Sequence, residues 1–482
     1  MRVLFILPAL NEKGSMGVNP RPFPCLTVST ATYIRNGGVD VRVLDAFLEN
    51  ISFEAIVSEV KDYGPDVIAV PLSEVNRCVP VMTALSLIQR LKKSRVNSTI
   101  VSFGRQDTEF IRRHLRGDGC IDYHIAGDPE ETMLDLMRTL AKNRQADPAG
   151  IGGLLYKNKE EVVFTGVRIT DNIDRIGFPD WSLIGLSRYS IVPHRYKNTG
   201  PYPIFETRGC LWGKCIFCQD GNSNGEPFRT KSPGKIAEEI VYARERYACK
   251  EIQFLGQQFN TDKDWLLLLE SEFKKNKINT RWSCLSRVDK VNPESLSVMK
   301  RLGCWNILFG IESTNESLLK SVNKGITGQQ IRDAVFWCRN EGIEVTGSFM
   351  MGLPGEKPKD VYNSVSFACH AGIDYVQLFI AKWPNERSEF KNEGYLTESC
   401  DFSQYDFGGR VLVPLAYNDF RHLKRIQRSA YQRFYFHPRT ILKHLGRIRS
   451  VNDFKRLCSG ARVVLCLLGI KKAVCHRLYS PA

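Results

Sequence analysis

Short apolar runs alternate with amphipathic segments along most of this chain of 482 residues. Between the runs, apolar residues recur with helical spacing, as Phe53, Ile56 and Val60 do. This alternation predicts a parallel sheet covered by helices on both faces. Residues 1–145 are therefore expected to form a doubly wound, Rossmann-like α/β domain. Its predicted strands are 3–7, 41–44, 67–70, 99–103 and 121–125.

A second series of the same kind begins at Ile204 and predicts a separate domain over residues 201–400. Its helices have clear start signals, such as Ser232-Pro233 and Asn292-Pro293. Six strand–helix units indicate an incomplete TIM-like barrel, and barrels of this type carry their sites at the carboxyl ends of the strands. The predicted strands are 204–207, 251–255, 281–285, 306–310, 345–349 and 375–380.

Residues 146–200 are rich in Gly and Pro but contain Trp181, which favours burial, so this segment is interpreted as a bridge between the two domains. Residues 401–482 are predicted to be a basic helical C-terminal region.

The net charge of +15 is concentrated in this tail, because residues 421–482 hold fifteen Lys and Arg against one acid, a local charge of +14. Such a segment is either a solvated helical cap or a site of attraction for an anionic partner. Its longest apolar run, 463–470, is too short to span a bilayer. A peripheral membrane contact remains open, since apolar residues interleave with the basic ones: Leu442, Leu445, Ile448 and Phe454.

The fifteen cysteines are scattered, and the first apolar run is too short for a signal peptide. We therefore expect a reducing, cytoplasmic location with thiols that are unpaired or bound to metal.

Three cysteines, Cys210, Cys215 and Cys218, follow the first predicted barrel strand. Iron–sulfur clusters are usually held by four cysteine thiolates. A run that supplies three and no obvious fourth leaves one iron open for a small molecule. The alternative is a structural zinc site completed by a distant ligand.

The run Arg-Gly-Cys followed by Cys-x-Phe-Cys, with Phe217 between the last two cysteines, resembles the radical S-adenosylmethionine (SAM) superfamily. It departs from the usual spacing by one additional residue between Cys210 and Cys215. The N-terminal sequence resembles the cobalamin-binding domain that precedes the barrel in one branch of that superfamily, and the resemblance covers nearly the whole chain. The segments that carry it are 22–28, 33–45, 122–131, 287–289, 310–313, 323–325, 347–356 and 434–439.

The resemblance implies three cofactors: a [4Fe–4S] cluster on the three cysteines, SAM and cobalamin. It implies that Glu312 binds the ribose hydroxyls, that Arg287 pairs with the methionyl carboxylate, and that Gly352 shapes the adenine-side turn. The respective alternatives are a solvated or helix-capping carboxylate, an ordinary surface salt bridge and a plain tight turn. Phe217, Ser313 and Gln257 are placed at the same site, Gln257 standing where the family often has a carboxylate.

For cobalamin, the resemblance points to the carboxyl ends of the N-terminal strands: Leu72, Ser73, Gly104 and Gly127. No Asp-x-His-x-x-Gly run follows the first strand, so no protein imidazole is expected on cobalt. A sheet that binds no cobalamin is the alternative.

The function implied is that of a cobalamin-dependent radical SAM enzyme, a C-methyltransferase acting on an unactivated carbon of a natural-product, peptide or lipid intermediate. An external electron donor of the flavodoxin or ferredoxin type is implied as well. A cyclase or rearrangement enzyme, a methylthiotransferase and a non-catalytic iron–sulfur or cobalamin sensor are the alternatives. Nucleic acid is not an expected partner, since no compact reading unit is visible.

Overall fold

The computed structural model describes residues 1–8, 23–49, 51–74, 81–104, 108–116, 120–189, 196–197, 200–218, 226–383, 392–396, 410–448 and 450–467. They form two compact units, the first built mainly from residues 1–190 and the second mainly from residues 191–482. We refer to them as the N-terminal unit and the barrel unit.

The N-terminal unit is built on a seven-stranded sheet with the order β2-β1-β3-β4-β5-β6-β7. The first five strands in sequence are parallel, and β6 and β7 extend the sheet in the antiparallel direction. The strands are β1 (Arg2–Leu7), β2 (Asp40–Asp45), β3 (Val67–Pro71), β4 (Thr99–Phe103), β5 (Tyr123–Ile125), β6 (Leu154–Asn158) and β7 (Glu161–Phe164).

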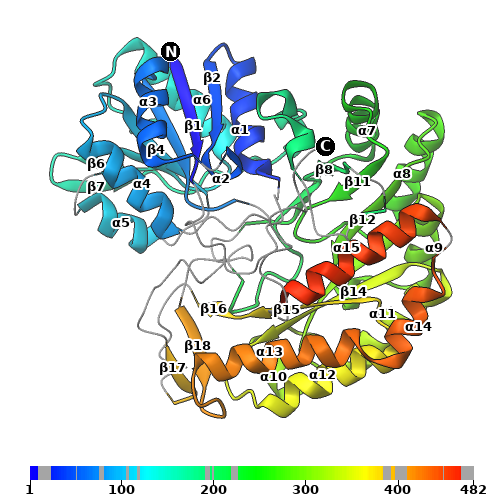
Figure 1. The fold of residues 1–482 in the computed structure, drawn as a ribbon. Coiled ribbons are helices and arrows are strands. Elements are labelled where there is room, and N and C mark those ends of the chain that lie inside the picture. Colours follow the sequence, from blue (N-terminus) through cyan, green and yellow to red (C-terminus); the bar gives the residue numbers. More distant parts are fainter. Residues whose placement is uncertain are drawn as a thin grey trace. The chain divides into compact units, whose positions relative to one another are not determined.

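Helices cover both faces of this sheet (Figure 1). Alternate residues of β1 enter two different cores: Leu4 and Ile6 pack with α3 (Phe53–Tyr63), α4 (Val81–Lys93) and α5 (Thr108–Arg116). Val3 and Phe5 pack with α1 (Cys25–Asn36) and α6 (Pro129–Lys142) on the other face. The strand is buried on both sides because it has no polar alternation. The predicted doubly wound architecture is confirmed.

The segment predicted to bridge the domains supplies β6 and β7 of the N-terminal sheet. Further along it, the fully buried Trp181 packs edge-on against Phe23, with ring centroids 5.7 Å apart. Residues 146–189 thus pack as part of the N-terminal unit.

The barrel unit is built on a six-stranded parallel sheet with the order β15-β14-β13-β12-β11-β8. Since β8 and β15 stand at opposite ends of that order, the barrel is incomplete, as predicted. Its strands are β8 (Tyr202–Ile204), β11 (Glu251–Phe254), β12 (Arg281–Ser286), β13 (Cys304–Glu312), β14 (Glu344–Met351) and β15 (Tyr375–Ile380).

The barrel helices begin at the signals visible in the sequence. Ser232, Asn292 and Thr327 each accept a hydrogen bond from a backbone N–H of the first turn that follows them, which satisfies an otherwise unpaired donor. The helices are α7 (Pro233–Tyr247), α8 (Lys263–Lys275), α9 (Pro293–Arg301), α10 (Glu316–Ser321), α11 (Gly328–Asn340) and α12 (Pro358–Ala371).

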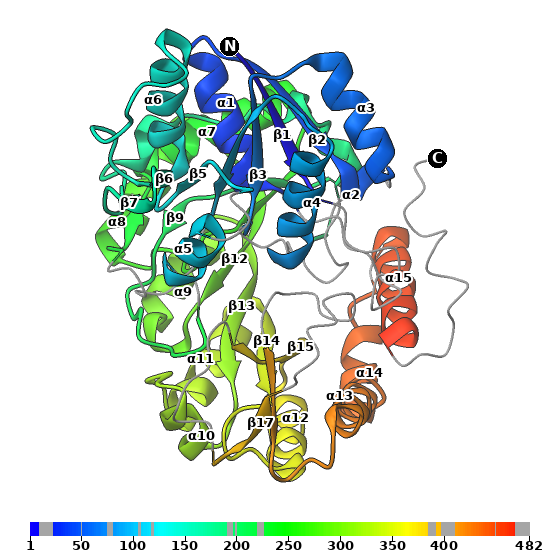
Figure 2. The ribbon, with the colours of Figure 1, turned by 90° about the vertical axis from the view of Figure 1, so that its left-hand side faces the viewer.

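After the barrel come a small antiparallel sheet and three helices (Figure 2). The sheet has the order β16-β18-β17, from β16 (Lys382–Trp383), β17 (Gly394–Leu396) and β18 (Arg410–Pro414). The helices of the basic tail are α13 (Phe420–Tyr435), α14 (Pro438–Leu445) and α15 (Val451–Leu467). Among the described residues, no helix combines the length and apolarity needed to cross a bilayer.

Candidate cofactor site in the barrel

The three cysteines lie on one loop at the carboxyl end of β8. A two-residue strand, β9 (Thr207–Arg208), pairs antiparallel with β10 (Arg229–Thr230), and the chain then enters the loop at Gly209. A Cβ at this position would lie 2.5 Å from the carbonyl oxygen of Pro227, and φ is +80°, so only glycine fits. Cys210, Cys215 and Cys218 are all partly exposed.

The loop, which we call the cysteine loop (residues 209–218), is docked onto the segment after α10. The N–H of Ile216 donates to the carbonyl of Val322 (3.2 Å), and the indole N–H of Trp212 donates to that of Asn323 (2.7 Å). The Trp212 ring fills the space beside Gly325, where an added Cβ would lie 2.1 Å from a ring carbon. These contacts fix the position of the cysteine loop, which has one additional residue between Cys210 and Cys215.

Buried amide groups without partners stand beside the loop. The thiol of Cys210 is 3.5 Å from Oε1 of Gln258, whose side chain is fully buried. The other amide atom of Gln258, Nε2, makes no hydrogen bond, and neither do Nε2 and Oε1 of Gln257. Buried polar groups are nearly always hydrogen-bonded, so three orphaned amide atoms at one turn are groups that a polar ligand could satisfy.

Glu206, two residues after β8, contacts the turn that holds Gln257 and Gln258. Its fully buried carboxylate accepts a hydrogen bond from the N–H of Gly256 (2.9 Å) through Oε2, while Oε1 has no partner. Burial raises the pKa of Glu206 to about 7. The sequence analysis missed this residue, although an acidic side chain at the end of an otherwise apolar strand was a signal.

A buried ion pair faces the cysteine loop from the carboxyl end of β13. Nζ of Lys324 lies 2.7 Å from Oε1 of Glu312, and both side chains are 8 % exposed. Glu312 has φ of +63° beside a register shift between Gly310 and Glu312, a costly conformation for a non-glycine residue. A carboxylate has acceptor sites beyond the one taken by Lys324 and can still bind a hydroxyl group. Sequence reasoning selected Glu312 but not its partner.

The charges around Cys215 oppose one another. Burial raises the pKa of the Cys215 thiol, whereas Lys324 and Arg287 act to lower it. Burial alone would lower the pKa of Lys324, but Glu312 and Cys215 outweigh it, and the net shift is upward. Lys324 is therefore a permanent positive charge beside a group that binds metal only as a thiolate.

Arg287 joins the same group of residues. Its guanidinium donates to both carboxylate oxygens of Asp289 (2.9 and 3.2 Å) and to the carbonyl of Lys324 (3.1 Å), and it lies 5.1 Å from the centroid of the Trp212 ring. Arg287 thus forms a buried ion pair, its side chain being 6 % exposed, and not the surface salt bridge of the alternative. Its pairing with a methionyl carboxylate stays a prediction.

Three further predicted residues lie around this group. Glu312 and Ser313 line a small cavity that also includes Glu356. Glu356 fixes the turn after Gly352 (φ +79°) by accepting from the N–H of Leu353 (3.0 Å) and from the Tyr417 hydroxyl (2.6 Å). Phe217 packs against the apolar cluster of Leu318, Val322, Leu353, Ala381, Trp383 and Leu412.

The donor set of the cysteine loop is three thiols on one short segment, and cysteine thiolates are the usual ligands of iron–sulfur clusters. Among the described residues, no group of three or more His, Cys, Asp or Glu side chains is placed to hold a metal ion.

The residues predicted for cobalamin lie together in the N-terminal unit but are explained in part by its own packing. The Leu72 side chain is fully buried in the apolar core. An added Cβ at Gly104 would lie 2.7 Å from the Ser73 carbonyl oxygen, and one at Gly127 would lie 2.0 Å from that of Arg168. Both glycines therefore permit close backbone approach within this unit, and their role toward a cofactor stays a prediction.

Residues 205–368, which include the cysteine loop and four of the barrel strands, match the family model described as the radical SAM superfamily. Over this segment the chain is similar to the radical SAM superfamily. The resemblance read from the cysteine motif is confirmed.

Several relatives match over most of the chain. It is 28 % identical over 450 residues to an uncharacterized methyltransferase, PH0819, of Pyrococcus horikoshii, a match that covers 92 % of this chain and 95 % of that protein. It is 24 % identical over 446 residues to the anaerobic magnesium-protoporphyrin IX monomethyl ester cyclase of Rubrivivax gelatinosus, covering 90 % and 77 % of the two chains.

Among solved structures, the fold is similar to that of TsrM, a radical SAM methyltransferase from Kitasatospora setae, solved with cobalamin and a [4Fe–4S] cluster bound. The TM-score is 0.70 at 14 % identity, and the match covers 96 % of this chain and 99 % of that one. At this identity the likeness shows the shared fold, an N-terminal α/β unit followed by a partial barrel.

Proposed function

We propose that this radical SAM protein is a cobalamin-dependent C-methyltransferase. The observation that carries the proposal is the cysteine loop, which presents three thiols beside orphaned amide groups and a buried ion pair. A three-thiolate set would hold a [4Fe–4S] cluster with one iron open to SAM, and the cluster and SAM together supply radical chemistry at unactivated carbon.

The protein's own residues would bind and orient SAM. The orphaned Oε1 of Gln257, with Glu206 nearby, would accept a hydrogen bond from its methionyl amine, and the orphaned Nε2 atoms of Gln257 and Gln258 would donate to acceptor atoms of SAM. Glu312 and Ser313, which line a small cavity, would accept hydrogen bonds from ribose hydroxyls, and the turn at Gly352 would border the adenine. Lys324 keeps a positive charge beside the thiolates, which favours their deprotonated form.

Cobalamin would bind to the N-terminal unit, at the carboxyl ends of its parallel strands. Ser73 and Gly104 stand side by side there, after β3 and β4, at an edge where doubly wound sheets bind their ligands. Methylcobalamin would supply the methyl group.

The substrate class is a small molecule, which includes natural-product, peptide or lipid intermediates. TsrM has been solved with tryptophan and a SAM analogue bound, which is a precedent for a small substrate in this fold. An external electron donor, a reducing cytoplasmic location and peripheral contact of the basic tail with a membrane belong to the same proposal. The buried thiols of the barrel unit are unpaired, as a reducing compartment requires: Cys249, Cys284, Cys304, Cys338 and Cys369.

A cyclase is the second candidate, because the relative from Rubrivivax gelatinosus has that activity by name and matches over 90 % of this chain. The mass of the product distinguishes the two reactions. A gain of one methylene unit indicates methylation, whereas a cyclase or rearrangement enzyme adds no methyl group.

The first test is anaerobic reconstitution with iron, sulfide and cobalamin, followed by assay of SAM cleavage to 5′-deoxyadenosine. Cys215→Ala is expected to abolish the brown cluster absorbance and SAM cleavage, because it removes one of three cluster thiolates. The control is Cys369→Ala, a buried thiol on α12, which should retain both signals. Full absorbance and cleavage in Cys215→Ala would contradict the proposal.

A further inference from the structure

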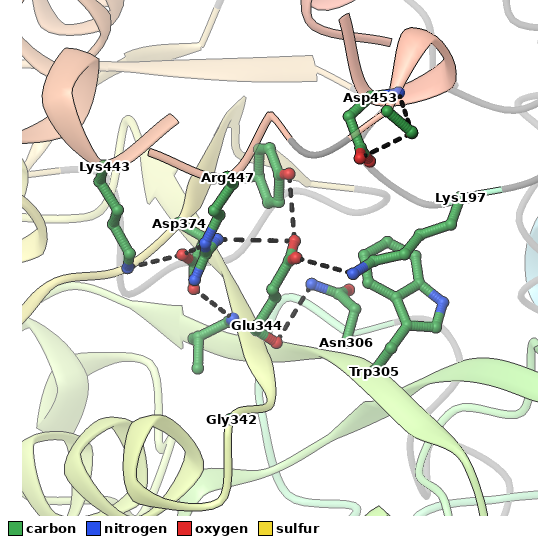
Figure 3. A network of polar contacts seen from close by, with 12 residues as sticks. Lys197, Trp305, Asn306, Gly342, Glu344, Asp374, Lys443, Arg447 and Asp453 are labelled. Carbon is green, nitrogen blue, oxygen red and sulfur yellow. Dashed lines mark hydrogen bonds and ion pairs between the residues drawn. The ribbon is translucent and has the colours of Figure 1, made fainter. Parts of the chain in front are cut away.

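Helix α14 presents its polar residues to the barrel. Asp374, fully buried at the start of β15, is paired with Nζ of Lys443 (2.5 Å) and with the guanidinium of Arg447, just after the helix (Figure 3). The carbonyl of Asp374 is bonded to the ring of His444 (3.1 Å). The inward-facing residues, Thr440, Lys443, His444 and Arg447, follow helical spacing.

A second buried acid strengthens this attachment. The Glu344 carboxylate accepts from the Tyr375 hydroxyl (3.1 Å), lies 3.0 Å from Nζ of Lys197, and is 3.7 Å from the guanidinium of Arg447 (Figure 3). The two basic residues turned toward the barrel are therefore neutralised by the protein itself, and one orientation of α14 is fixed.

The opposite side of α14 is apolar and exposed. Ile441, Leu442 and Leu445 are 39 %, 69 % and 52 % exposed. A helix on a water-soluble protein normally buries its apolar face and exposes its polar one. Helix α14 does the reverse, so its outward face is available to an apolar partner.

The exposed apolar residues continue into α15, where Val451 and Phe454 are 71 % and 55 % exposed. The charged residues around them are basic: Arg439, Lys455 and Arg462 are exposed, and none forms an ion pair with another described residue. We call these eight residues the α14–α15 surface. Asp453 is the single acid between residues 436 and 467, and it bonds to Ser450.

We propose that the α14–α15 surface binds the anionic surface of a lipid membrane. Bulky aliphatic and aromatic side chains flanked by arginine and lysine match such an interface, where apolar groups enter the acyl boundary and basic groups meet lipid phosphates. Nucleic acid is the less favoured partner, because leucine, valine and phenylalanine gain little from a phosphate backbone. A second copy of this chain is less favoured because it would bring two like-charged surfaces together.

The test is co-sedimentation of the cluster-loaded protein with vesicles of phosphatidylcholine, with and without phosphatidylserine. We expect binding to the anionic vesicles that weakens with salt. Leu442→Glu with Leu445→Glu should weaken that binding by at least about tenfold, because it places charge in the apolar contact. Arg439→Gln, Lys455→Gln and Arg462→Gln should each weaken it by roughly fivefold.

The matched control is Leu267→Glu with Leu268→Glu, which alters two adjacent exposed leucines on α8 of the same unit and should leave vesicle binding unchanged. A variant that retains cluster absorbance and SAM cleavage is folded. If the wild-type protein itself showed no SAM cleavage, that result would contradict the proposed enzymatic function and not the membrane proposal. Three results would overturn the membrane proposal. The first is no binding to anionic vesicles, and the second is an equal loss of vesicle binding in the Leu442/Leu445 and Leu267/Leu268 double variants. The third is that the Leu442/Leu445 double variant loses dimerisation or oligonucleotide binding but still binds vesicles.

Discussion

At the scale of single residues, Glu206 is the most unusual group of the barrel. It is fully buried, accepts one backbone hydrogen bond and leaves one oxygen without a partner. Desolvation disfavours the charged form of such a group, which is why its pKa is raised from 4.5 to about 7. A buried carboxyl that titrates near neutrality beside Gln257 and Gln258 is a candidate for orienting a cationic ligand.

Glu206 should make the stability of the protein depend on pH. Between pH 4.5 and about 7 the folded protein keeps a proton that the unfolded chain releases, so the free energy of unfolding falls as pH rises through this window. The loss amounts to about 3 kcal/mol above the window. Glu206→Gln should remove this component and flatten the profile measured by urea unfolding.

Burial also raises the pKa of Glu356 to about 7. Glu356 contributes the same pH dependence to the wild type and to Glu206→Gln, so the difference between their two profiles reports Glu206 alone. Glu238→Gln, an exposed substitution on α7, serves as the control and should reproduce the wild-type profile. An unchanged slope in Glu206→Gln would show that this carboxyl is not protonated in the folded protein.

At the scale of elements, the cysteine loop is held by contacts to a segment more than a hundred residues away. Trp212 and Ile216 bond to the carbonyls of Asn323 and Val322, and Gly325 leaves room for the Trp212 ring. The loop therefore depends on the turn that follows α10 as much as on its own sequence.

Gly325→Ala is expected to displace the cysteine loop. The new methyl group would overlap the Trp212 ring, and φ of +68° is strained for alanine. The iron content after reconstitution should fall several-fold, with a loss of stability of about 1–3 kcal/mol. Gly234→Ala on α7, where no atom lies within 4 Å of the added Cβ, is the matched control. Equal iron content in both variants would show that the docking does not support the cluster.

At the scale of the whole molecule, the basic residues of the tail fall into two groups. Lys443 and Arg447 neutralise buried acids of the barrel, while the basic residues of the α14–α15 surface stay exposed. The excess charge of the tail is thus partly internal, and the remainder faces outward with the exposed apolar residues.

Asp374→Asn should loosen this attachment. It removes the negative partner of Lys443 and Arg447 from a fully buried position, and breaking a buried ion pair costs about 3–5 kcal/mol. Faster hydrogen exchange in residues 438–448 is the expected result, with little change in the N-terminal unit. Asp333→Asn, on the exposed side of α11, is the control. Unchanged exchange in α14 would show that apolar contacts alone hold the helix.

Much of the fold was predictable because buried parallel strands are almost entirely apolar and their helices carry local start signals. Residues 3–7 and 251–255 identify strands β1 and β11 without further information, and Asn292 and Thr327 mark the helix starts. The sequence predicts a bridge over residues 146–200 because Gly and Pro interrupt its apolar pattern, whereas the place of β6 and β7 in the N-terminal sheet depends on the pairing of β6 with β5.

The sequence by itself determined the two α/β units, the partial barrel and the three-cysteine motif, since these follow from local periodicity and from residue spacing along one loop. Only the tertiary structure decided that Lys324 pairs with Glu312, that Arg287 donates to the carbonyl of Lys324, and that α14 turns its leucines outward. Such contacts join segments distant in the chain or depend on which face of a helix packs inward. Hydrophobic pattern and local propensity contain neither piece of information.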